Sequence, residues 1–159
     1  MRQKKGYTVF ELVVYITLLA LMLAVTSASA LSVYRIFGVM RIERQITLEG
    51  DIAIETMIRD IRSATSTNVA ESVFASNPGT LKIGSGVRFS LAGTTLQRNG
   101  VATQDLTAKA RVTNLLFYRV DAPSVNSEII TIRMTLEAGN GFFERSRNFF
   151  GSAVPRGSY

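Results

Sequence analysis

The sequence of 159 residues contains no cysteine and no histidine. Their absence removes the usual zinc ligands, thiol nucleophiles, disulfides and imidazole bases. The remaining carboxylate, lysine and tyrosine side chains form no cluster along the chain that is typical of an active site. The glycine-rich phosphate-binding motifs of nucleotide enzymes are missing as well. We therefore expect a protein that is not an enzyme and that binds no metal and no cofactor.

Proline is scarce, because the chain has only three prolines and the first is Pro78. Proline breaks the interior of a helix, and no proline interrupts residues 8 to about 66. This stretch predicts one long helix of ~90 Å. Its first half is apolar on all sides, which suits lipid or the core of a filament.

The second half of the predicted helix is amphipathic. Apolar residues recur mainly at spacings of three, four and eight and form one stripe, which predicts that this half packs on a domain. Gly38 and Gly50 are expected to be weak points, where the helix could bend or locally melt. The stripe consists of Ile42, Ile46, Ile54, Met57, Ile58 and Ile61.

After the turn signal at residues 77–79 the pattern becomes that of β-strands. Asn99-Gly100 is a strong hairpin signal. The sequence therefore predicts an α+β fold, with a long N-terminal helical spine packed on a C-terminal antiparallel β-sheet. Its expected parts are an apolar helix over 7–34, an amphipathic half over 35–68 and a β-rich head over 69–159. Strands are expected within 81–83, 87–91, 94–98, 110–120, 128–136 and 142–149.

The formal net charge of +6 includes Arg2, Lys4 and Lys5 near the N-terminus, and without them 15 basic and 12 acidic residues leave +3. Fourteen of the eighteen basic residues are arginines, and they are scattered among acidic residues and strand positions. A nucleic-acid-binding protein usually concentrates its basic residues on one patch, so we consider nucleic acid an unlikely partner. Positive charges before Leu12 predict a cytoplasmic N-terminus.

The most distinctive segment is Lys4-Lys5-Gly6-Tyr7-Thr8-Val9-Phe10-Glu11, which precedes a twenty-residue apolar run from Leu12 to Leu31. As a helix this run is ~30 Å long, enough to cross the hydrocarbon of a membrane. An unpaired carboxylate at the mouth of such a segment is costly and is usually retained for a function. Cleavage after Gly6 would create an amino group on Tyr7, four residues before Glu11, that could neutralise it.

Two other interpretations of the N-terminus stay open. An ordinary secretory signal would place its cleavage site after Ala30, at Ala28-Ser29-Ala30, and would release a soluble β protein. A plain signal anchor would explain the basic flank and the length of the apolar run. The first conflicts with Glu11 at the start of the apolar core and with the apolar residues after Ala30. The second gives no reason for Gly6-Tyr7 or for Glu11.

The dense pattern over residues 4–16 resembles the class III leader of type IV pilins and type II secretion pseudopilins. The resemblance implies that residues 1–6 are a leader that prepilin peptidase removes after Gly6. It also implies that Tyr7 becomes the N-methylated terminus and that Glu11 serves filament assembly. The implied protein is a single-pass subunit of the inner membrane with its head outside the cytoplasm. Its implied partners are the peptidase and methyltransferase, other pilins or pseudopilins, and an inner-membrane assembly platform.

Three further segments resemble J-type minor pseudopilins and minor type IV pilins, namely residues 57–64, residues 111–118 and Arg147-Asn148. The lack of cysteine also departs from many major pilins. The resemblance thus implies a minor subunit of a type IV pilus, a type II secretion system or a competence machine. An alternative is a DNA-binding or adhesive module on such a filament. Phe142, Phe143, Phe149 and Phe150 flank Arg145 and Arg147, and we expect these aromatic side chains to belong to the core.

Overall fold

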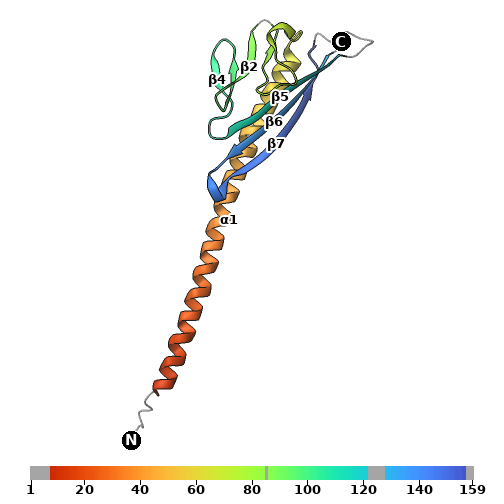
Figure 1. Cartoon of the computed structure of the whole chain (residues 1–159). Coiled ribbons are helices and arrows are strands. Elements are labelled where there is room, and N and C mark those ends of the chain that lie inside the picture. Colours follow the sequence, from red (N-terminus) through yellow and green to blue (C-terminus); the bar gives the residue numbers. More distant parts are fainter. Residues whose placement is uncertain (1–7, 85, 122–127, 157–159) are drawn as a thin grey trace. The chain divides into compact units, whose positions relative to one another are not determined.

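The computed structural model describes residues 8–84, 86–121 and 128–156. The chain divides into two compact units between Gly38 and Val39. One helix, α1, runs from Val9 to Ser63 and contributes residues to both units (Figure 1). The structure has the predicted α+β class, with one long N-terminal helix and antiparallel sheets in the C-terminal part.

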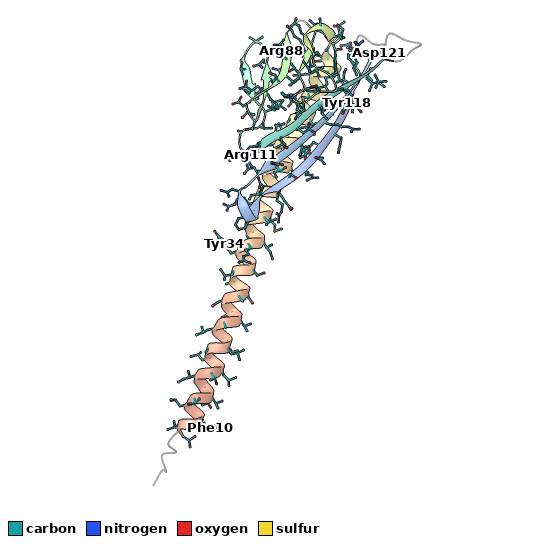
Figure 2. The ribbon with its side chains drawn as sticks, in the orientation of Figure 1. Phe10, Tyr34, Arg88, Arg111, Tyr118 and Asp121 are labelled. Atoms are coloured by element: carbon teal, nitrogen blue, oxygen red, sulfur yellow. The ribbon has the colours of Figure 1, made fainter. Side chains whose placement is uncertain are left out.

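The first unit is the beginning of α1. Its large apolar side chains are exposed around the whole helix, from Phe10 to Tyr34 (Figure 2). The apolar stretch of α1 that is long enough to span a membrane buries none of its residues within the protein. Nothing among the described residues covers this surface. By length and composition, the helix is compatible with a single membrane span.

The second unit contains two antiparallel sheets where the sequence predicted one. The first has the strand order β1-β2-β3-β4 and the second has the order β5-β6-β7. Both are meanders in which consecutive strands pair (Figure 1). The strands are β1 (Leu81–Ile83), β2 (Val87–Ala92), β3 (Thr95–Asn99), β4 (Thr103–Asp105), β5 (Arg111–Asp121), β6 (Glu128–Ala138) and β7 (Arg145–Ala153).

The core forms between the end of α1 and both sheets. The predicted apolar stripe of the helix is confirmed, although its members Ile42 and Ile58 lie at the margin and are only partly buried. Alternate residues of β6 and β5 point into the same core because side chains alternate between the two faces of a strand. The buried set includes Ile46, Ala53, Met57, Ile61, Phe89, Leu96, Leu115, Phe117, Ile132 and Met134.

Gly50 is a packing site, which corrects its interpretation as a weak point of the helix. It is buried within the unbroken helix α1, and the ring of Phe149 lies directly against its Cα. A Cβ atom at this position would lie only 2.2 Å from Phe149 Cζ. The missing side chain therefore lets strand β7 approach the helix closely, and backbone flexibility is not its role here.

The helix ends at Ser63, slightly before the expected end at about residue 66. Beyond it, the backbone N–H and the hydroxyl of Thr67 each donate to the Glu128 carboxylate, at 2.7 Å. Glu128 is only 6% exposed and also forms an ion pair with Arg119, whose Nε atom lies 2.8 Å away. These contacts satisfy a buried carboxylate and attach the segment after α1 to the start of β6.

Three features of the sheets depart from the predictions. Strand β4 was not predicted, because its three residues are all exposed and carry no apolar alternation. The last strand was expected over 142–149 but begins at Arg145, after a 3₁₀ turn, η2, over Gly141–Phe143. Phe149 belongs to the core as expected, whereas the expectation for Phe150 was wrong. Phe150 is 64% exposed, because neighbouring residues of a strand face opposite sides.

Glu49 attaches the loop before β5 to the helix. Its carboxylate accepts hydrogen bonds from the backbone N–H groups of Ala108, Lys109 and Ala110, at 2.9–3.2 Å. A carboxylate binds three adjacent N–H groups more strongly than a neutral amide does. We expect Glu49→Gln to lower the free energy of unfolding by about 1 kcal/mol. Denaturant titration of the full chain in detergent measures this, with Glu55→Gln as the control because the Glu55 carboxylate bonds to no described residue.

Glu71 joins the η1 turn (Val69–Glu71) to the first sheet through ion pairs with Lys82 at 2.8 Å and Arg88 at 3.2 Å. The hydrogen bond from Lys82, with the charges of Lys82 and Arg88, lowers the pKa of Glu71 below its ordinary value of 4.5. The charged form is therefore favoured by folding, and its contribution is present above pH 4.5 and is lost as the pH falls through the lower pKa of the folded state. We expect the stability difference between the native chain and Glu71→Gln to shrink below pH 4.5. A difference that persists unchanged in acid would contradict this, and thermal unfolding over a pH series measures it.

Candidate assembly site at the start of the helix

The candidate site begins at the first turn of α1, where Thr8 is the N-cap. The Thr8 hydroxyl accepts a hydrogen bond from the backbone N–H of Glu11 at 3.3 Å, and the Thr8 carbonyl accepts one from the N–H of Leu12 at 3.2 Å. Side chains that accept from the first N–H groups of a helix fix where it begins. Thr8 therefore starts the helix at Val9 and places Glu11 in its first turn.

Glu11 lies where a negative charge is favoured by the helix itself. The first turn carries unpaired N–H groups and the positive end of the helix dipole. The Thr-x-x-Glu spacing is also that of a capping box, in which the glutamate can reach back to the backbone of the cap residue. The first turn of the helix thus favours the carboxylate of Glu11 through its own N–H groups and dipole.

The Glu11 carboxylate forms no hydrogen bond and no ion pair with any described residue. Its neighbours are exposed apolar side chains, since Val9 is 81% exposed and Phe10 is 79% exposed. Figure 2 shows Phe10 at this end of the ribbon. Within the described residues, an acceptor without a partner therefore stands at the edge of a large exposed apolar surface.

The other predicted site residues divide into two groups. Gly6 and Tyr7, expected at the cleavage and methylation site, lie outside the described residues. Leu12 and Leu31, expected to delimit the apolar span, both lie within α1 and are 55% and 60% exposed. Within the described part of the chain, no group of three or more acidic side chains could hold a metal ion.

Two basic clefts between α1 and the residues of or after β7 were not predicted. The Arg44 cleft has a volume of ≈ 430 Å³ and contains Arg44, Arg145 and Arg147, with Glu43 at its side. The Arg59 cleft has a volume of ≈ 550 Å³ and is lined by Glu55, Ile58, Arg59, Arg62, Ser63 and Arg156. Sequence spacing could not reveal either cleft, because each combines helix residues with residues about a hundred positions later.

Comparison of the chain with protein-family models, with curated proteins and with solved structures found no match.

Proposed function

We propose that this protein is a minor pilin or pseudopilin, a structural assembly subunit of a type IV pilus, a type II secretion system or a competence machine. The observation that carries the proposal is the Glu11 carboxylate, which has no partner among the described residues and stands in the first turn of an exposed apolar helix. The resemblance of residues 4–16 to a class III prepilin leader supports the same conclusion. So does a helix whose second half packs on antiparallel sheets.

In the proposed mechanism, prepilin peptidase cleaves after Gly6 and the new Tyr7 terminus is methylated. The subunit then waits in the inner membrane, with its N-terminus cytoplasmic and its β domain outside. During assembly, the Glu11 carboxylate pairs with the Tyr7 amine of a neighbouring subunit. A low-dielectric bundle of helices favours this pair over either charge alone, so the pair sets the axial register of the subunits.

The distribution of arginines supports assembly rather than nucleic-acid binding. The two basic clefts share no lining residue and are therefore separate sites rather than one basic patch. Five further basic side chains are occupied by ion pairs with acidic residues. A surface of mixed charge is suited to specific contacts with other proteins. Binding the phosphate backbone of a nucleic acid would require a continuous basic surface.

Fractionation of cells that express the full chain together with its assembly machine tests the proposal. We expect the protein in the membrane fraction and in filaments or membrane complexes that contain other pilin-like subunits. Recovery of a soluble protein whose first residue is Leu31 would establish a secreted β protein instead. A chain that stays in the membrane and never joins other pilin-like subunits would establish a plain anchor.

A further inference from the structure

The Arg44 cleft lies between the part of α1 that begins at Met40 and the first residues of β7. Met40 and Ile46 provide its apolar lining, and Arg44, Arg145 and Arg147 provide its charge. The residues that line it are Met40, Glu43, Arg44, Ile46, Thr47, Arg145, Ser146 and Arg147.

The three guanidinium groups are not neutralised by the chain itself. None of them forms an ion pair within residues 8–84, 86–121 and 128–156. Two of them are positioned by neutral acceptors, because Arg147 donates to the Thr47 hydroxyl at 2.6 Å and Arg145 donates to the Glu144 carbonyl at 2.9 Å. Guanidinium forks held in place in this way match the oxygens of a phosphate group. With Glu43 as the single acidic residue of the lining, the cleft keeps a net positive charge.

The cleft begins where the apolar stretch of the chain ends. From Leu12 to Met40 there are 29 residues, and Arg35 is the only charged one. As a helix this stretch is ~44 Å long, close to the thickness of a bilayer with its headgroups. Arg44 follows Met40 by one helical turn, and helical side chains tilt toward the N-terminus. If the apolar stretch crosses a membrane, Arg44 therefore points back toward the phosphate layer of the outer leaflet.

We propose that the Arg44 cleft binds the phosphate of an anionic phospholipid, such as phosphatidylglycerol, at the outer surface of the membrane. The arginines of the helix and of β7 hold the phosphate between them. The cleft prefers a headgroup of net negative charge, because a choline group would add a like charge beside the arginines. This inference rests on the membrane insertion in the proposed function and does not depend on the pairing of Glu11.

The bound lipid would attach the head domain to the membrane surface before assembly. Its release would then be part of the cost of extracting the subunit.

The full chain in detergent micelles, titrated with phosphatidylglycerol or with phosphatidylcholine of the same acyl chains, tests the proposal by native mass spectrometry. We expect the native chain to retain phosphatidylglycerol preferentially. Arg44→Gln/Arg145→Gln should weaken this binding about fivefold for each arginine and leave phosphatidylcholine binding unchanged. Arg147 is kept in this variant because its bond to Thr47 joins the strand to the helix. Circular dichroism verifies that the variant is folded.

The matched control is Arg59→Gln/Arg62→Gln, which removes the same charge from the other basic cleft. Arg62 follows Met40 by 22 residues, or ~33 Å along a helix, so this cleft lies beyond the headgroup layer. The leader residues are identical in all variants, and their effect therefore cancels in the comparison. Phosphatidylglycerol binding should be the same in this control and in the native chain.

Three results would overturn the inference. The first is a native chain that binds both lipids equally well. The second is an Arg44→Gln/Arg145→Gln variant that binds phosphatidylglycerol as the native chain does. The third is an equal loss of phosphatidylglycerol binding in both double variants. Any of these results would overturn the lipid site alone, provided that the chain still inserts into vesicles of pure phosphatidylcholine. The proposed assembly function would then stand. A chain that fails to insert into those vesicles would remove the membrane insertion on which both proposals depend.

Discussion

Replacing Glu11 with alanine should leave the protein cleaved and anchored in the membrane but reduce its incorporation into filaments by a factor of 100 or more. The carboxylate has no partner among the described residues, so its removal breaks no contact described within the subunit. In the assembled bundle, however, it would leave the Tyr7 amine of a neighbour uncompensated in an apolar environment. Loss of one member of a buried ion pair costs about 3–5 kcal/mol. Immunodetection of the variant in sheared filaments measures the effect.

Two further variants separate the ion pair from helix capping at this site. Glu11→Gln keeps a side chain that can bond to the Thr8 backbone but removes the charge, and it should fail in assembly as Glu11→Ala does. Glu55→Ala removes an exposed acidic side chain from the other half of α1 and should assemble normally. Normal incorporation of Glu11→Ala would contradict the role of Glu11. Normal incorporation of Glu11→Gln alone would assign Glu11 to capping.

Gly50→Ala should destabilise the second unit by about 2–3 kcal/mol, even though alanine is the better helix former. The new Cβ would lie within 2.2–2.5 Å of three ring atoms of Phe149. A core at native packing density has no space for this displacement, so strand β7 must shift away from α1. Denaturant unfolding of the full chain in detergent measures the change.

The control for Gly50→Ala is Gly86→Ala, because a Cβ at Gly86 meets no atom within 4 Å. We expect its free energy of unfolding to stay within about 0.5 kcal/mol of that of the native chain. Combining Gly50→Ala with Phe149→Leu should cost less than the sum of the two single changes, because the smaller side chain relieves the clash. An increase in stability on Gly50→Ala would show that Gly50 is a weak point of the helix after all.

The sequence predicted what depends on local periodicity. The apolar stripe of α1 and the alternation in β2, β5 and β6 were sufficient to place these elements, because each face of a helix or strand has its own repeat. The tertiary role of Gly50 was not predictable, since glycine lowers helix propensity in every context and only the position of Phe149 reveals a packing site. Strand β4 has only exposed polar residues, so its one sequence signal was the Asn99-Gly100 turn, which joins it to β3 in a hairpin.

The candidate site was predictable in its chemistry and less so in its geometry. The order of Gly6, Tyr7 and Glu11 indicated the proposed processing and pairing. The cap formed by Thr8 had a recognisable signal in the Thr-x-x-Glu spacing, which is that of a capping box. The Arg44 cleft had none, because Arg44 and Arg145 meet only after β7 packs beside the helix.

The most direct test of the proposed assembly function is the mass of the N-terminal peptide from protein recovered from membranes of cells that contain prepilin peptidase. We expect a peptide that begins at an N-methylated Tyr7. That result would place a free cationic terminus four residues before Glu11, the arrangement that the proposed ion pair needs. A peptide that begins at Met1 or at Leu31 would contradict the proposed assembly function, because neither terminus supplies that partner.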